Sequence, residues 1–198
     1  MKDRRDFSDF DPNGVSIHEG VFGLPYNENE AKIVIFPVPW DVTSSYSAGS
    51  SNGPEAILNA SYQVDLYDPF VKEVWKLGLF MRPISKLWQK RNSTYRAIAE
   101  KYIGALEKGH SEHFQNALKS VNEKCEELRS YIHKETKALI EKGKLVVLLG
   151  GDHSTPLGYV QALAEKHKTF TVLQIDAHAD LRISFEDFEH SHASIMHN

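Results

Sequence analysis

The sequence predicts an α/β fold with a mainly parallel sheet, because apolar runs alternate with amphipathic segments along the chain. Residues 144–151 (KLVVLLGG) form a near-continuous apolar run, which is typical of a strand buried on both faces. Residues 156–168 carry a helical pattern, and residues 169–176 (TFTVLQID) form a second apolar run. A strand, a helix and a strand in this order favour parallel pairing. Residues 32–38 (KIVIFPV), rich in β-branched and aromatic side chains, predict a further strand.

The first third of the chain also predicts an arm, a loop and two short elements. Residues 1–30 are polar and mixed, and we expect an extended N-terminal arm. Residues 41–57 are rich in Ser, Gly and Asn, which predicts a loop that leads into a short helix. Pro54 suits the first helical turn, where its missing N–H is no loss, and Glu55 is favoured at the positive end of the helix. Residues 77–80 (LGLF) predict a short strand.

The middle of the chain predicts two helices after a basic, irregular segment at 81–93. Residues 94–106 have a plausible helical pattern. Residues 112–142 carry the clearest one, and Gly143 is expected to end that helix. We favour a helix that covers a sheet or a neighbouring helix over a coiled-coil seam. The apolar stripe recurs at steps of three, four or seven residues and comprises Phe114, Leu118, Val121, Cys125, Leu128, Ile132 and Leu139.

Composition and charge narrow the class of protein. The 198 residues are 41% hydrophobic and 25% charged, as in an ordinary globular protein. The net charge of −4 gives no electrostatic reason to expect nucleic-acid binding. The apolar runs are too short to span a bilayer, and the polar N-terminus lacks a signal region. Cys125 is the only cysteine, so an internal disulfide is impossible. We therefore expect a cytoplasmic protein without membrane or nucleic-acid partners.

Metal-capable side chains follow both strands of the predicted parallel pair. His153 lies in GGDHS, directly after the first strand. The motif DAHADLR, after the second strand, carries Asp176, His178 and Asp180. Because ligands bind beyond the carboxyl ends of parallel strands, these groups can face one pocket. In extended backbone the three residues of DAHAD point to the same face, since side chains alternate.

This many buried charges would cost many kcal/mol unless a cation were present. Carboxylates with imidazoles suit Mn, Zn, Fe or Ni better than Ca. Asp176 could bridge two ions, and two-metal sites activate water for hydrolysis. Asp152 could be a ligand or, as we favour, a carboxylate that fixes an imidazole. His192 could shuttle protons or bind substrate, or be a solvated loop histidine. Asp41 is assigned to turn formation.

These motifs together resemble the ureohydrolase family, which includes arginase, agmatinase and formimidoylglutamase. GGDHS resembles the family's first metal motif and DAHADLR its second. The stretch at 39–57, PWDVTSSYSAGSSNGPEAI, resembles the family's N-terminal pattern. SHASIM at 191–196 resembles the loop that carries a pocket histidine in agmatinase-type members. The resemblance covers roughly residues 31–197, with a possible helical insertion at about 81–143.

The resemblance implies a three-layer αβα arginase-like fold and a binuclear manganese hydrolase that acts on C–N bonds of linear amidines. His153 and Asp180 would bind the first Mn²⁺, His178 the second, and Asp176 both; Ni²⁺ is an alternative metal. His192 and Asp180 would be the catalytic residues. The expected reaction is agmatine to putrescine and urea. Arginase or formimidoylglutamase specificity remains open.

The resemblance also implies a further metal motif, Ser-Phe-Asp-x-Asp, downstream of DAHAD. The sequence through Asn198 does not contain it in that place. We therefore expect weak metal binding and little or no activity from the 198-residue chain, and a trimer or hexamer for a complete enzyme. The alternatives are a non-catalytic paralogue that acts as an assembly partner and another metallohydrolase with strand-end ligands.

Overall fold

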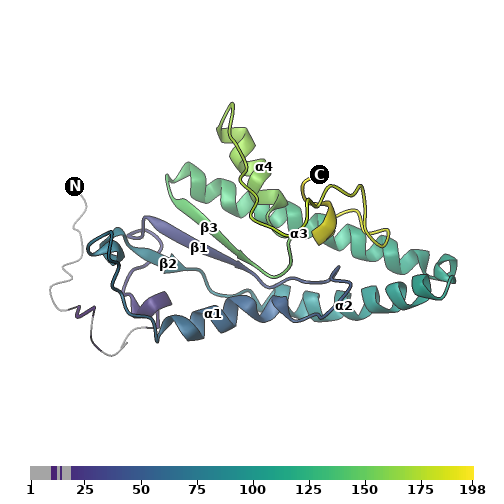
Figure 1. Cartoon of the computed structure of the whole chain (residues 1–198), viewed down its shortest axis with the longest axis horizontal. Helices are drawn as coiled ribbons and strands as arrows, with labels where there is room; N and C mark the ends of the chain where they lie inside the picture. Colours follow the sequence, from purple (N-terminus) through teal and green to yellow (C-terminus); the bar gives the residue numbers. More distant parts are fainter. Residues whose placement is uncertain (1–9, 13, 15–18) are drawn as a thin grey trace.

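The fold is a parallel sheet with helices on both faces, as the sequence predicts (Figure 1). The structure is a computed structural model that describes residues 10–12, 14 and 19–198. Within these residues the strands are β1 (Ile33–Val38), β2 (Leu79–Met81) and β3 (Leu145–Gly150). They form a three-stranded sheet in the order β2-β1-β3, and both pairings are parallel. The predicted strands at 32–38, 77–80 and 144–151 are therefore confirmed to within two residues.

The central strand β1 is buried on both faces, which its unbroken apolar sequence predicts. Val34, Phe36 and Val38 point into the main core, which lies between the sheet and helices α2 and α3. Ile35 points to the opposite face, where it packs with Val21 and Met81. The described part of the predicted N-terminal arm thus contributes to the second face of the sheet.

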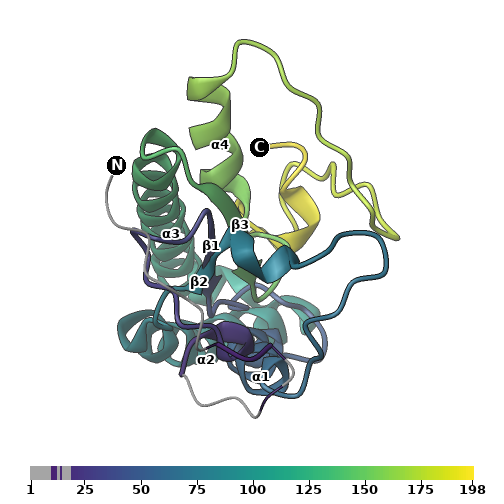
Figure 2. The same ribbon diagram turned by 90° about the vertical axis from the view of Figure 1, so that its left-hand side faces the viewer.

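In the part of the chain that the structure describes, four α-helices surround the sheet, and their bounds are α1 (Gly53–Ser61), α2 (Lys86–Glu107), α3 (Gln115–Glu141) and α4 (Leu157–Lys166). Figures 1 and 2 show α1 on one face and α3 with α4 on the other. Four of the predicted helices are confirmed, and Gly143, with φ of 75°, follows the end of α3 as expected. Short 3-10 helices occupy Val21–Gly23, Ser50–Asn52, Val74–Leu77, Ser111–Phe114 and His192–Ser194.

Helix α2 begins earlier than the sequence analysis predicts, inside the segment described there as irregular. The Ser85 hydroxyl accepts a hydrogen bond from the Trp88 amide at 3.3 Å and caps the helix at its first turn. Trp88 is buried edge-on against Trp40, with ring centroids 5.7 Å apart. The cap and this tertiary contact together extend α2 by about two turns beyond the predicted start at residue 94.

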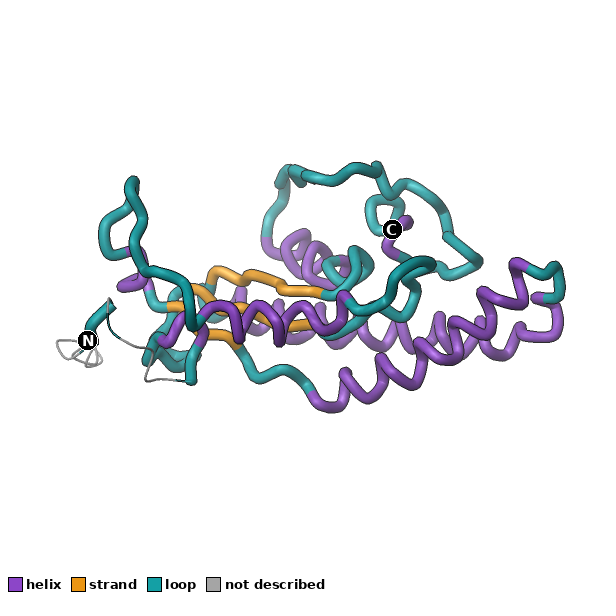
Figure 3. The backbone as a smooth tube through the Cα atoms, turned by 60° about the horizontal axis from the view of Figure 1, so that its bottom comes forward, coloured by secondary structure: helices purple, strands orange, loops and turns teal. Residues whose placement is uncertain are grey.

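The predicted strand at 169–176 is wrong, because this segment makes no ladder with β3 in the structure. The chain leaves α4 as an extended loop, visible in Figure 3, and Leu173 and Ile175 are 83% and 92% exposed. The outer edge of β3 is correspondingly open, with Leu145 and Val147 partly exposed. The local sequence favours a strand here, but strand formation also requires a paired neighbour.

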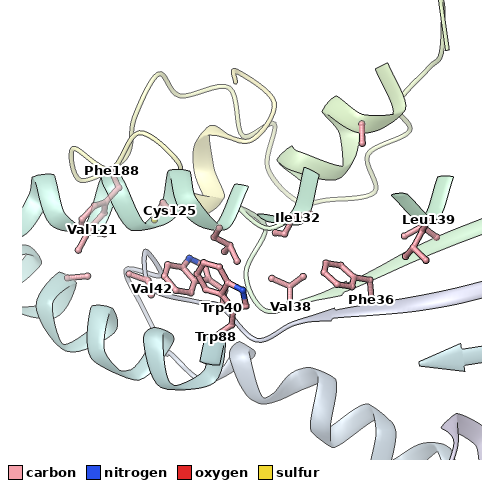
Figure 4. Packing of buried hydrophobic residues seen from close by; sticks show 14 of the residues in the cluster. Phe36, Val38, Trp40, Val42, Trp88, Val121, Cys125, Ile132, Leu139 and Phe188 are labelled. Atoms are coloured by element: carbon pink, nitrogen blue, oxygen red, sulfur yellow. The ribbon is translucent and has the colours of Figure 1, made fainter. Parts of the chain in front are cut away.

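Helices α2 and α3 form an antiparallel pair that extends past the carboxyl ends of the strands (Figure 1). The C-terminal segment, residues 183–198, folds back over this projecting part. The main core continues into the same region, where Phe188 packs beside Val121 (Figure 4). The helix pair therefore lies under the edge of the sheet at which the candidate ligands gather. None of the helices described is long and apolar enough to cross a membrane.

Candidate metal centre

His153 is presented by a tight turn between β3 and α4. The Gly151 amide donates to the Val38 carbonyl at 3.0 Å, and the Asp152 amide donates to the Trp40 carbonyl at 2.9 Å. These bonds draw the turn against the end of β1. A Cβ at position 151 would lie 1.9 Å from the Trp40 carbonyl oxygen, so only glycine fits. The second glycine of the GGDHS motif is therefore required for the approach that places His153.

Asp152 holds the turn together from the inside. Its carboxylate accepts hydrogen bonds from the Ser154 amide at 2.9 Å and the Ser154 hydroxyl at 2.5 Å. The hydroxyls of Thr43 and Ser44 lie 3.5 Å from its other oxygen. Burial raises the pKa of Asp152, and the bonds from Ser154 oppose that rise. The carboxylate fixes the backbone of the turn, rather than an imidazole as the sequence analysis favours.

Three of the four predicted metal ligands converge at the carboxyl end of β3. The Nδ1 atom of His153 lies 2.6 Å from Oδ2 of Asp180 and 3.2 Å from Oδ2 of Asp176. One donor atom from each residue falls within 4.8 Å of the other two. The Asp180 side chain is 7% exposed and the Asp176 side chain 25%, so the group is sheltered on one side.

Asp180 owes its position to the C-terminal segment. Its φ is 50°, an uncommon value for a residue with a side chain. The Asp180 carbonyl accepts from the Met196 amide at 3.0 Å, and the Arg182 amide donates to the Ala193 carbonyl at 3.1 Å. These two backbone bonds hold the chain that follows the Cα atom of Asp180 against the segment that carries His192.

Asp176 is kept ionised by a neighbouring amide. The His178 N–H donates to Oδ1 of Asp176 at 2.9 Å, and this bond is the main cause that lowers the pKa of Asp176. The partial burial of the carboxylate opposes the shift, and the charge of His153 adds to it. An ionised carboxylate beside an imidazole is the form that binds a divalent cation.

His178 does not join the other three residues. Its side chain is 81% exposed, and its Nδ1 lies 3.7 Å from Oδ1 of Asp176. The backbone bends at 176–178 instead of continuing as a strand, so the alternation that would align the side chains does not hold. The assignment of His178 as a ligand stays a prediction.

His192 begins the 3-10 helix His192–Ser194, and its ring packs edge-on against Phe185 with centroids 5.5 Å apart. Its Nδ1 atom is buried and has no hydrogen-bond partner among the described residues. A buried imidazole nitrogen without a partner can still donate or accept a proton. The structure thus gives a sheltered histidine rather than a solvated one, and its catalytic role stays a prediction.

Asp41 and Asn92 form a hydrogen-bonded pair beside this region. The sequence predicts a role in turn formation for Asp41 and does not single out Asn92. The Asp41 carboxylate accepts from the amides of Gly49 and Ser51 at 2.7 and 3.0 Å, and from Nδ2 of Asn92 at 2.9 Å. The Asp41 amide donates back to Oδ1 of Asn92 at 2.8 Å. Turn formation, the role expected for Asp41, is confirmed, whereas Asn92 lies in a segment without any sequence signal for this contact.

The donor set fits one divalent cation. One imidazole and two carboxylates match the ligand preferences of Mn²⁺, Zn²⁺, Fe²⁺ or Ni²⁺. A cavity of about 420 Å³ is lined by His153, but not by Asp176 or Asp180. It lies between the end of β3 and the start of α4, and its lining includes Gly150, His153 and Tyr159.

Comparison with known proteins places the chain in one family. Residues 31–198 match the family model described as Arginase family. The N(1)-aminopropylagmatine ureohydrolase of Synechocystis sp. is 32% identical over 171 residues, which cover 84% of this chain and 46% of that relative. The agmatinase of Bacillus anthracis is 28% identical over 166 residues, with 83% and 46% covered.

The solved structure of the agmatine ureohydrolase of Thermoplasma volcanium has a TM-score of 0.64 to this chain at 21% identity. The match covers 90% of this chain and 49% of the other, and it supports the αβ fold of arginase-type proteins. This chain spans about half the length of the relatives it matches. The GGDHS and DAHAD motifs and the parallel sheet agree with this family. Because its model matches residues 31–198, the chain belongs to the arginase family.

Proposed function

We propose that the chain forms part of a manganese-dependent ureohydrolase that removes urea from a guanidino compound. The observation that carries the proposal is the convergence of His153, Asp176 and Asp180 at the carboxyl end of β3. This is where parallel sheets place their ligands, and the two motifs come from successive segments of a family member.

His153, Asp176 and Asp180 would hold one Mn²⁺ in this chain, and His178 would bind a second ion in the complete enzyme. A divalent ion in such a site supplies Lewis acidity and activates water. His153 and the two carboxylates orient the reacting groups, and the low exposure of Asp180 limits competition from bulk water. His192 would accept or donate a proton at its imidazole nitrogen.

For the substrate we propose an aminoalkyl guanidine, agmatine first. The similar relatives are named agmatinase and N(1)-aminopropylagmatine ureohydrolase, so an aminopropylated guanidine is the second candidate. Arginine and formimidoylglutamate are less favoured because SHASIM resembles the agmatinase-type loop. A non-catalytic assembly partner stays the alternative from a different class. For a complete enzyme we propose a trimer or hexamer.

The test is an assay of the purified chain with Mn²⁺ that measures urea released from agmatine, N(1)-aminopropylagmatine and arginine, and formamide released from formimidoylglutamate. Because three donors converge among the described residues, enough for one ion, we expect at most slow release, greatest with the aminoalkyl guanidines. His153→Ala should abolish this release because it removes the central imidazole.

The matched control is His167→Ala, since His167 is exposed at the end of α4 and away from the three donors. It should release urea like the unchanged chain. Urea release without added metal, or release retained in His153→Ala, would contradict the proposed site. Robust turnover of the 198-residue chain would contradict the expected low activity. A chain that binds Mn²⁺ but gives no urea with any substrate would favour the assembly-partner alternative.

A further inference from the structure

A tight two-residue turn lies between the metal ligands and His192. The amides of Phe185 and Phe188 each donate to the other residue's carbonyl, at 3.2 and 3.0 Å. The central residues Glu186 and Asp187 both have positive φ, 52° and 62°. This is the type I′ pattern, which favours Gly or Asn because a side chain at positive φ costs free energy. Contacts from elsewhere in the molecule must therefore hold the turn in place.

Phe188 anchors the turn in the main core. It is fully buried, and its ring packs edge-on against Tyr102 of α2 with centroids 5.7 Å apart. Figure 4 shows it beside Val121 of α3, at the end of the core that projects beyond the sheet. An aromatic side chain buried between two helices restricts the position of the backbone on each side of it relative to those helices.

Asn122 of α3 holds the backbone on both sides of Phe188. Its Nδ2 donates to the Asp187 carbonyl at 3.4 Å, and its Oδ1 accepts from the Glu189 amide at 3.2 Å. A carboxamide has a donor and an acceptor side by side, so it can satisfy two successive peptide groups as a neighbouring strand would. A single side chain thereby sets the register of the turn on the helix.

Two further residues of this segment, Asp187 and His190, also contact the helix pair. The buried Tyr102 hydroxyl donates to the Asp187 carboxylate, and burial together with this bond raises the pKa of Tyr102 to about 12. On the other side, Nε2 of His190 lies 3.2 Å from Oε2 of Glu126 on α3. The contacts therefore come from both helices and reach the turn and the residues after it.

The turn is rigidly connected to the functional residues that follow. The Ser194 hydroxyl donates to the Glu189 carbonyl at 2.8 Å and accepts from the Ser191 amide at 3.0 Å, which closes the loop around His192. The same loop contacts Asp180 through the Met196 amide. A displacement of Phe188 would therefore move both His192 and the backbone of Asp180.

We propose that the α2/α3 pair supports and positions the His192 loop, with Asn122 and Tyr102 as its positioning residues. This inference rests on the proposed function for the role of His192, but the support of the loop by the helix pair is argued from contacts alone. The helix pair, which the sequence suggests is an insertion, thus becomes a support for the candidate active site. Neither Asn122 nor Tyr102 is required to touch metal or substrate.

The test is hydrogen–deuterium exchange of the full 198-residue chain, compared with Asn122→Ala and Tyr102→Phe. Asn122→Ala removes two hydrogen bonds to the turn segment, and Tyr102→Phe removes one and keeps the ring. We expect exchange of amides in 186–197 to rise about tenfold, with β1 and β3 unchanged. Asn122→Asp should be intermediate because it retains an oxygen for the Glu189 amide.

The matched control is Asn116→Ala, since Asn116 is an exposed asparagine on the same helix. It should leave exchange of 186–197 unchanged. Unchanged exchange in both positioning variants, or a uniform rise through α3 and β3, would overturn the proposal. Where urea release is measurable, the positioning variants should lower kcat with little change in KM. Local loosening without any urea release would support the positioning role of the helix pair and would count against the proposed function alone.

Discussion

Asp41 is a buried carboxylate that orders a surface loop from its inner side. It is 1% exposed, yet it accepts bonds from two loop amides and from Asn92. Burial alone would raise its pKa, but the bonds from Ser51, Asn92 and Gly49 outweigh burial and lower it. The charged form is therefore the one that the folded protein prefers, and it connects the loop after β1 to helix α2.

Asp41→Asn should lower the free energy of unfolding at pH 7 by about 1–3 kcal/mol, because the amide cannot accept all of these bonds. Since the folded pKa of Asp41 is below its ordinary value, its contribution is present above that value and is lost as the pH falls through the folded pKa. The difference between the two proteins in urea denaturation should therefore shrink on acidification below about pH 4.

Asp65→Asn provides the control, because Asp65 is exposed in the loop after α1. It should change stability by no more than about 0.5 kcal/mol at either pH. A loss for Asp41→Asn that is the same at pH 3 and pH 7 would show that the charge of Asp41 does not carry the effect.

At the scale of elements, α3 and α4 pack through a glycine. A Cβ at Gly158 would lie 2.3 Å from the Arg129 carbonyl oxygen and 2.8 Å from the His133 amide nitrogen, both backbone atoms of α3. The polar contacts of Glu165 with His133 and Lys137 cross the same interface. The helix that follows the His153 turn is thus set by direct backbone contact with α3.

Gly158→Ala should therefore lower the free energy of unfolding by about 1–3 kcal/mol, since the two helices must move apart. Gly104→Ala in α2 is the matched control: it is the same substitution in a helix, but a Cβ there meets no atom within 4 Å. It should stabilise the protein by about 0.5–1 kcal/mol through helix propensity. Thermal and denaturant unfolding measure both, and shifts of the same sign would refute the packing argument.

The elements that the sequence predicts correctly are those whose signal is local. Strands β1 and β3 and helix α3 are recognised from unbroken apolar runs and from a stripe with helical period. The early start of α2 depends on the buried contact between Trp88 and Trp40, which no local pattern contains. The segment at 169–176 has strand propensity but no partner in the described structure, so propensity alone misleads there.

At the scale of the whole molecule, the meeting of the candidate ligands was predicted, but not the backbone that brings it about. His153 was expected to meet the residues of DAHAD because both motifs would follow paired strands. Asp176 and Asp180 do lie beside His153, although residues 169–176 form no strand. The position of His178 could not be predicted, because it depends on the bend at 176–178. The support of the His192 loop by α2 and α3 joins residues up to 85 positions apart, a distance over which sequence patterns carry no information.

The same geometry predicts how many ions the chain binds. Among the described residues one group of three donors converges, so Mn²⁺ titration by calorimetry or electron paramagnetic resonance should give one ion per chain. Asp180→Asn should weaken binding at least tenfold, because it removes the carboxylate 2.6 Å from His153. His178→Ala should change the affinity of this first ion by less than twofold, since its side chain is 81% exposed and lies outside the group. Two ions per chain, with equal losses in both variants, would instead show that the 176–178 bend straightens when metal binds, and that His178 is a ligand of a complete binuclear site.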